Sequence, residues 1–148
     1  MNLLGLMDVS GSALQAERTR AEVVAANMAN AETTRTADGG PYRRQEVVFS
    51  SEAPSDAFAS RLSLASGPTE PAIGGVRVSA VVTDPSSPLQ RYDPGNPDAD
   101  KNGYVAYPDI NPLTEMVDLM GATRAYGLNS SAVQAEKGMI SASLDILK

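Results

Sequence analysis

The residues with the clearest potential for chemistry form a short acidic run in the second half of the chain. The run from Asp98 to Gly103 has the sequence DADKNG, which matches the start of an EF-hand calcium loop. Asp98, Asp100 and Asn102 would supply oxygen ligands, and Asp109 stands at the twelfth position of the loop. One hypothesis is therefore a calcium-binding module.

The surroundings of this run favour a turn instead. Residues 92 to 97 contain two prolines and a glycine, which break the entering helix that an EF-hand needs. The twelfth position carries Asp where a bidentate Glu is usual. Asp, Asn and Gly are also the residues that tight turns use, because they tolerate positive φ or bond their own backbone. The preferred interpretation is a turn between strands, with no metal site and no cofactor.

The composition removes most catalytic chemistry. The chain of 148 residues contains neither histidine nor cysteine, and hence lacks the commonest general base and every thiolate ligand. Serines, threonines and carboxylates are present, but no motif gives any of them a partner base. We therefore expect no enzyme and no catalytic residue. The net charge of -6, with scattered Arg and Lys, argues against nucleic acid as a partner.

The N-terminus shows no sign of targeting. Its apolar run ends at Asp8, before the core of a signal peptide would be complete. No segment approaches about 20 consecutive apolar residues. We expect neither a cleaved signal peptide nor insertion into a membrane.

The element that dominates the chain is a long helix predicted over residues 111 to 148. Asn111 is a suitable N-cap, Pro112 suits the first helical position, and no proline follows. At about 1.5 Å per residue this helix would be roughly 55 Å long, more than the ~30 Å diameter of a small domain. Small or apolar residues recur three and four apart along it, at Leu113, Val117, Met120, Leu128, Ala132, Ala135, Met139, Ala142 and Ile146. This row predicts a seam against another long element.

The N-terminal segment supplies that element. Residues 3 to 31 have helical periodicity, with Met7, Leu14, Ala21 and Met28 on one line. The two terminal helices are therefore predicted to pack as an antiparallel, coiled-coil-like pair. Alanine buries little area, and glycines inside the last helix cost up to ~1 kcal/mol each. We infer that burial is completed only against copies of the chain or its relatives; the alternative is a monomeric helical-hairpin adaptor.

The middle of the chain predicts a small β region. Residues 42 to 49 indicate a strand or extended arm, residues 76 to 82 alternate with a period of two, and two short strands follow at 89 to 92 and 104 to 107. We expect one antiparallel sheet of about three strands. Residues 50 to 75 lack periodicity, apart from a possible helical turn at 57 to 64, and suggest a variable region. The fold class is α+β, mainly α.

The end of the first helix carries a recognisable signature. Residues 26 to 34 read ANMANAETT, which resembles the A-N-x-A-N-x-x-T-T signature of bacterial flagellar rod, hook and hook-associated axial proteins. The matching motif residues are Asn27, Asn30, Thr33 and Thr34. Segments 35–49, 93–108 and 111–126 also resemble rod members of this family, so the likeness covers nearly the whole chain. Gly127 and Leu128 depart from the usual family pattern.

The resemblance implies a structural role in the flagellar basal body. The expected function is a subunit that polymerises helically into the periplasm-crossing rod, transmits torque and encloses the export channel. The implied partners are other copies of the chain, rod proteins such as FlgB, FlgF and a FliE-like adaptor, and the flagellar type III export apparatus. Residues 1–31 with 111–148 would form a helical, D0-like inner layer, and residues 32–110 an outer layer.

The predicted site residues are those that would serve assembly. Asn27 and Asn30 are expected to bond backbone groups at the helix end or on a neighbour. Helix packing is assigned to eight apolar residues of the two helices, namely Met7, Leu14, Met28, Leu113, Met120, Leu128, Met139 and Ile146.

Overall fold

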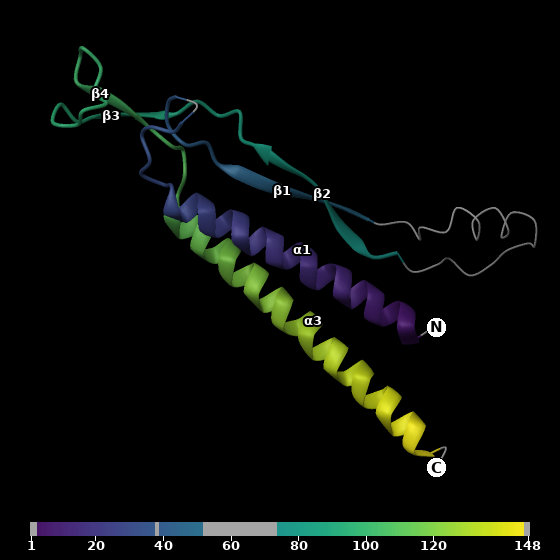
Figure 1. Cartoon of the computed structure of the whole chain (residues 1–148). Helices are drawn as coiled ribbons and strands as arrows, with labels where there is room; N and C mark the ends of the chain where they lie inside the picture. Colours follow the sequence, from purple (N-terminus) through teal and green to yellow (C-terminus); the bar gives the residue numbers. More distant parts are fainter. Residues whose placement is uncertain (1–2, 38, 52–73, 147–148) are drawn as a thin grey trace, which may run out of the picture.

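The structure is a computed structural model that describes residues 3–37, 39–51 and 74–146. Two long helices, α1 (Leu3–Ala29) and α3 (Pro112–Ile146), lie side by side and antiparallel (Figure 1). Between them in the sequence come β1 (Gln45–Ser51), β2 (Val76–Thr83), β3 (Leu89–Tyr92) and β4 (Tyr104–Tyr107). The predicted fold class, mainly α with an antiparallel terminal helix pair, is confirmed. The helical turn predicted at 57–64, and all but the ends of the variable region, lie outside the described residues.

The helix ends follow from local hydrogen bonds. Asn111 caps α3, because its Oδ1 accepts a bond from the backbone N–H of Leu113 at 3.0 Å. At the other end of the connection, the Nδ2 of Asn30 donates to the carbonyl of Ala26 at 2.9 Å, which satisfies a carbonyl in the last turn of α1. The chain leaves α1 through a further turn in which Thr33 N–H donates to the carbonyl of Asn30 at 3.0 Å.

The strands form two separate antiparallel pairs. β1 pairs with β2, with a register shift between Val48 and Phe49, and β3 pairs with β4. The prediction of a single sheet of about three strands is therefore wrong. Pro85 and Pro88 stand between β2 and β3 and lack the amide donors that a continuous ladder needs.

The elements are layered around α1. This helix contacts α3 on one side and both β1 and β2 on the other (Figure 1). Ser12 of α1 contributes to the sheet side, since its Oγ accepts a bond from the N–H of Val76 at 3.1 Å. The β3–β4 hairpin lies beyond the end of the helix pair where α3 begins.

The core of the described chain is small. Its buried hydrophobic residues are Ala16, Val24, Val105, Ile110 and Ala122. Alanine and valine bury little area, so at ~25 cal/mol per Å² this core contributes little. Two of the largest fully buried side chains are polar, Glu115 and Asn27. The architecture therefore depends on how these two groups are satisfied.

Candidate assembly site

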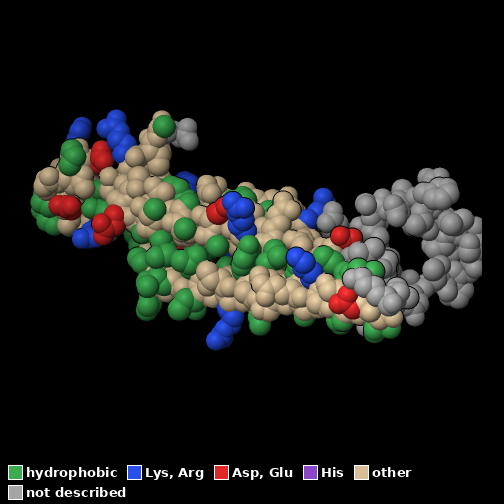
Figure 2. Space-filling view, turned by 60° about the horizontal axis from the view of Figure 1, so that its bottom comes forward, with side chains coloured by type: hydrophobic (Ala, Val, Ile, Leu, Met, Phe, Trp, Pro, Cys, Tyr) green, Lys and Arg blue, Asp and Glu red, His purple; other side chains and the backbone are tan. Residues whose placement is uncertain are grey.

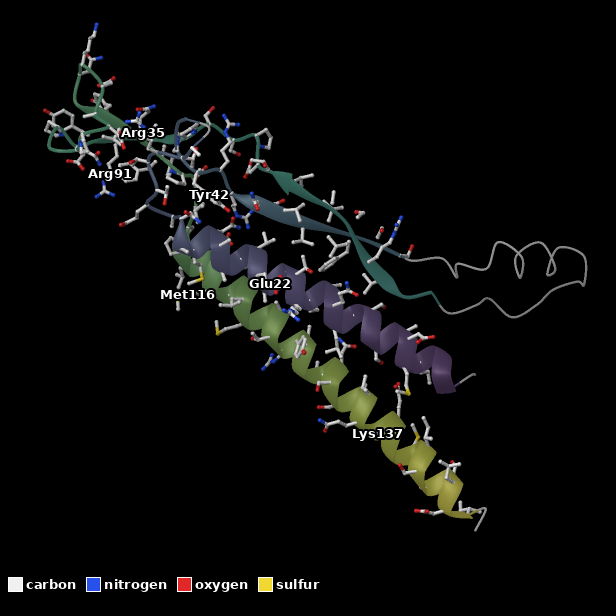
Figure 3. The ribbon with its side chains drawn as sticks, viewed as in Figure 1. Glu22, Arg35, Tyr42, Arg91, Met116 and Lys137 are labelled. Carbon is white, nitrogen blue, oxygen red and sulfur yellow. The ribbon has the colours of Figure 1, made fainter. Side chains whose placement is uncertain are left out.

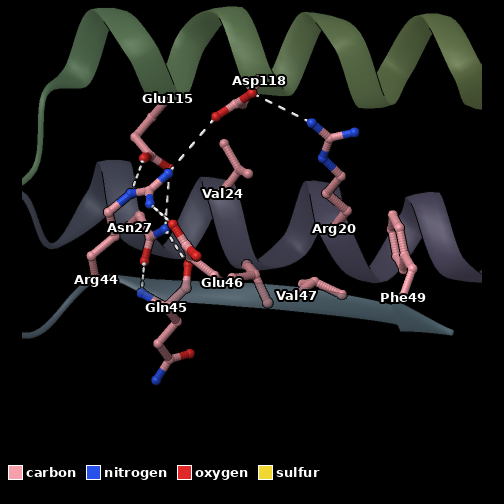
Figure 4. A pocket seen from close by; sticks show the side chains of 11 residues that line it. Arg20, Val24, Asn27, Arg44, Gln45, Glu46, Val47, Phe49, Glu115 and Asp118 are labelled. Atoms are coloured by element: carbon pink, nitrogen blue, oxygen red, sulfur yellow. Dashed lines mark hydrogen bonds and ion pairs between the residues drawn. The ribbon is translucent and has the colours of Figure 1, made fainter. Parts of the chain in front are cut away.

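Asn27 joins the last turn of α1 to the start of β1. Its side chain is 1% exposed. The Nδ2 donates to the carbonyl of Gln45 at 2.8 Å, and the Oδ1 accepts from the N–H of Gln45 at 2.9 Å (Figure 4). The carboxamide thus occupies the place that a peptide group of a neighbouring strand would take. This pair of bonds fixes the start of β1 relative to the end of α1.

Glu115 brings α3 to the same point. Its buried carboxylate accepts a bond from Asn27 Nδ2 at 3.1 Å and from Arg44 Nε at 2.6 Å. A buried charge is tolerated when it is both paired and hydrogen-bonded, as it is here. The hydrogen bond to Glu115 raises the pKa of the Arg44 guanidinium above its usual range. We call Asn27, Tyr42, Arg44 and Glu115 the polar node.

Tyr42, in the segment between α1 and β1, is the fourth member of the polar node. Its hydroxyl donates to Asn27 Oδ1 at 3.2 Å. Burial, and secondarily the negative charge of Glu115, raise the pKa of the Tyr42 phenol above its ordinary value. Each side-chain oxygen of Asn27 and Glu115 therefore accepts at least one hydrogen bond. The node therefore connects α1, the segment that leads into β1, and α3.

A cavity of about 300 Å³ adjoins the node between α1, β1 and α3 (Figure 4). Asp118 on its rim faces Arg20 at 3.4 Å and Arg44 at 3.8 Å, and Arg44 also pairs with Glu46. Val24, Val47 and Phe49 form its apolar wall. The carboxylates of the cavity already pair with arginines of the same chain. The cavity therefore belongs to the contact among α1, β1 and α3.

The predicted row on the last helix faces away from α1. The residues of α3 that are buried are Glu115, Ala122 and Glu136, which are spaced by multiples of seven and share one face. At 100° per residue the predicted row lies on the opposite face. Its large side chains are exposed: Leu113 by 70%, Met120 by 61%, Leu128 by 67%, Met139 by 51% and Ile146 by 85%. The prediction that this row packs against the N-terminal helix is wrong.

We call this uncovered face, from Leu113 to Ile146, the outer row. Val117 in this row and the neighbouring Met116, near the start of α3, are both at least half exposed. Figure 3 shows Met116 projecting from α3 on the side away from α1. Hydrophobic side chains are exposed along the helix pair in Figure 2 with few charges among them. The structure leaves an apolar helix face without a partner in the described chain.

The remaining predicted residues lie at the side of α1 and at its end. Met7, Leu14 and Met28 are half-buried. Thr33 Oγ1 donates to Asn30 Oδ1 at 3.1 Å, and Thr34 Oγ1 donates to Asp98 Oδ2 at 2.8 Å. The motif residues therefore connect the end of α1 to the loop between β3 and β4. The role of Met7, Leu14 and Met28 in packing between subunits stays a prediction.

The acidic run forms the loop of the β3–β4 hairpin. Asp100 Oδ1 accepts bonds from the N–H groups of Asn102 at 2.7 Å and Tyr104 at 2.9 Å, and Gly103 has φ of 80°. The bond from Tyr104 is the main cause that lowers the pKa of Asp100. Asp98 pairs with Arg35. Within the described ranges no three acidic, His or Cys side chains gather as a metal site would require.

Sequence reasoning missed three members of the node: Tyr42, Arg44 and Glu115. Glu115 has the position of an ordinary acidic residue in the first turn of a helix, where the dipole favours it. Arg44 belongs to the only adjacent arginine pair, which is a weak signal. The two residues are 71 positions apart, so their contact has no local signature.

An antiparallel pair of terminal helices with an outward apolar face defines a protein with a surface suited to binding other chains. Comparison with protein families agrees. The family model described as "Flagella basal body rod protein" matches residues 7–35, and the model described as "Flagellar basal body rod FlgEFG protein C-terminal" matches residues 101–146. Of the helices that the structure describes, neither has the length and apolarity to cross a membrane.

Similar full-length proteins narrow the family. The chain is 39% identical over 158 residues to the flagellar basal-body rod protein FlgC of Borreliella burgdorferi, covering 100% of this chain and 99% of that protein. It is 42% identical over 146 residues to FlgC of Bacillus subtilis, with 96% of each chain covered. Identity to FlgC of Salmonella typhimurium is 39% over 140 residues, covering 95% of this chain and 94% of the other. The chain belongs to the FlgC family of flagellar basal-body rod proteins, and is a structural protein.

Proposed function

We propose that the chain polymerises helically into the rod that crosses the periplasm, transmits torque to the hook and encloses the export channel. Residues 1–31 with 111–148 form the inner layer of this rod, and residues 32–110 form the outer layer. The observation that carries the proposal is the outer row of α3, which is apolar, exposed and turned away from α1. Large exposed apolar patches mark interaction surfaces.

The energetics of the lone chain support assembly. Its buried hydrophobic residues are few and small, whereas the outer row holds leucine, methionine and isoleucine in contact with water. Covering such side chains contributes ~25 cal/mol per Å² of apolar area removed from water. Binding to neighbours therefore stabilises the helix pair by mass action. The half-buried Met7, Leu14 and Met28 complete the surface that neighbours cover.

The partners follow from membership of a rod family. They are other copies of this chain, the rod proteins FlgB and FlgF, and a FliE-like adaptor. The flagellar type III apparatus exports the chain to the basal body. The likeness to FlgC proteins over nearly the full length supports this placement.

The test is a double substitution in the outer row, Leu128→Asp with Met139→Asp. Both positions are exposed, so the free energy of unfolding of the lone chain should change by no more than about 0.5 kcal/mol each. The double variant should not co-sediment with the other rod proteins. It should also fail to restore motility when it is expressed in a strain in which the gene has been deleted. Lys137→Asp, an exposed change outside the row, is the matched control. Normal basal bodies in the double variant would contradict the proposal.

A further inference from the structure

Arg124 stands in the middle of the outer row. It lies one helical turn from Met120 on one side and from Leu128 on the other, and its side chain is exposed. Within the described residues Arg124 makes no hydrogen bond or ion pair, whereas Arg20 and Arg44 both pair with carboxylates. A subunit that covers the outer row must therefore meet this cation. Burying it without an anion would be costly.

A groove opens between the two helices. It has a volume of about 310 Å³, and no strand residue lines it. Ala21 and Ala122 leave room in it because their side chains are small, and Tyr126 provides an aromatic wall. The remaining lining residues are Glu17, Arg18 and Thr123.

Glu17 is the unusual member of this groove. Its Oε2 is buried and has no hydrogen-bond partner within the described residues. The nearest cation, Arg20, lies 3.8 Å from this atom, beyond hydrogen-bond distance. A buried acceptor without a donor is destabilising. The side chain as a whole is 17% exposed, so Glu17 lies at the surface of the groove while its Oε2 is covered.

Arg124 and Glu17 lie at the same level along the axes of the two helices. Because α1 and α3 are antiparallel, the groove places Glu17 of α1 beside Tyr126 of α3. Arg124 is two residues from Tyr126, on the face of α3 that points away from α1. Two copies placed side by side with little shift along the helix axis therefore bring Arg124 of one copy to the height of Glu17 of the other.

We propose that Arg124 of one copy enters the groove of a neighbouring copy and donates a hydrogen bond to Glu17. Met120 and Leu128 of the entering copy then pack on the apolar walls of the groove. The contact rests on the proposed self-assembly, and it identifies one pair of residues at the interface. It is heterologous, because the row of one copy meets the groove of the next, so every added copy presents both surfaces again.

The absence of cysteine allows a direct test in the full chain. Glu17→Cys and Arg124→Cys are introduced together, and basal bodies are purified and treated with a mild oxidant. Within one chain Glu17 lines the groove between the helices, whereas Arg124 lies on the face of α3 that points away from α1, and a disulfide inside one chain would in any case leave it a monomer. A ladder of dimers and larger species can therefore come only from neighbouring copies. Glu22→Cys with Arg124→Cys is the control, because exposed Glu22 is outside the groove.

The proposal expects the ladder with the Glu17 pair and monomer with the Glu22 pair. Assembled rods in which the Glu17 pair stays uncrosslinked would overturn it. Charge reversal gives an independent readout if the cysteine pair prevents assembly. Arg124→Glu and Glu17→Arg should each abolish motility, and the two together should restore it, while Lys137→Glu stays motile. Failure of the double reversal to restore motility, with that control intact, also overturns the contact.

These outcomes separate the contact from the function. Normal rods carrying Arg124→Glu alone would defeat only the Arg124–Glu17 contact. A strain that keeps its rods after deletion of the whole gene would instead defeat the proposed rod function.

Discussion

The Nδ2 of Asn27 lies 3.1 Å from the Oε2 of Glu115, and both side chains are 1% exposed. These residues stand 88 positions apart, at the end of one helix and the start of the other. Sliding of α3 along α1 would break this bond and separate the buried Glu115 carboxylate from Arg44. Leaving a buried charged group without its partners costs about 1 to 3 kcal/mol or more. The pair therefore sets the register of the helices.

Asn27→Asp tests this register. The change removes the amide that donates to Gln45 and Glu115, and it places a second carboxylate beside the first. We expect a loss of about 3 kcal/mol or more in the free energy of unfolding, measured by urea denaturation at neutral pH. Asn30→Asp is the matched control, because Asn30 bonds only within its own helix end. A smaller loss for Asn27→Asp than for Asn30→Asp would contradict the assignment.

Arg44→Met tests the cation of the node. It leaves Glu115 buried without its charge partner, so the free energy of unfolding should fall by about 3 to 5 kcal/mol. Adding Glu115→Leu removes the stranded charge, and the double variant should recover part of that loss. A double-mutant cycle in urea measures the coupling. Additive effects of the two changes would show that the ion pair is energetically unimportant.

The pKa of Tyr42 predicts an alkaline limit to stability. Burial first, and then the charge of Glu115, raise it above the ordinary value of 10.0. The unfolded chain therefore releases this proton before the folded chain does, so the contribution is fully present below about pH 10 and is lost as the pH rises through the folded pKa. Tyr42→Phe should flatten the decline of stability above pH 10. Tyr92→Phe controls for the loss of a phenol.

Gly103→Ala should destabilise the β3–β4 hairpin. Gly103 has φ of 80°, and a Cβ there would lie 2.9 Å from Cε2 of Tyr92. The left-handed conformation alone costs an L-residue about 1 to 2 kcal/mol. Hydrogen exchange of the β3 and β4 amides should accelerate accordingly. Gly95→Ala is the matched control, since its Cβ would meet only Asp93 Oδ1 at an ordinary 3.7 Å. Unchanged exchange in Gly103→Ala would contradict the expectation.

Gly138→Ala should have the opposite effect on the lone chain. A Cβ at this position would meet nothing within 4 Å, and Gly138 lies inside α3. The change should stabilise the helix by up to about 1 kcal/mol, seen as a higher midpoint of thermal unfolding followed by circular dichroism. The same gain is expected at Gly121, which is equally open. A lower midpoint would show that the described chain needs these glycines.

Much of the fold could be read from local patterns. Asn111 and Pro112 predict the start of α3, and the alternation after Val76 predicts β2, because capping and strand periodicity depend on neighbouring residues. The short strands at 89–92 and 104–107 were predicted at the observed positions. Local chemistry also favoured a turn over a calcium loop at Asp100.

The sequence by itself thus determined the elements, their order and the family. Only the tertiary structure decided which face of α3 meets α1, because small or apolar residues occur on more than one face of that helix. The outcome is set by Asn27, Arg44 and Glu115, which look like ordinary polar residues until the fold brings them together. Burial of such groups is favourable only when distant partners satisfy their hydrogen bonds, and that condition exists only in three dimensions.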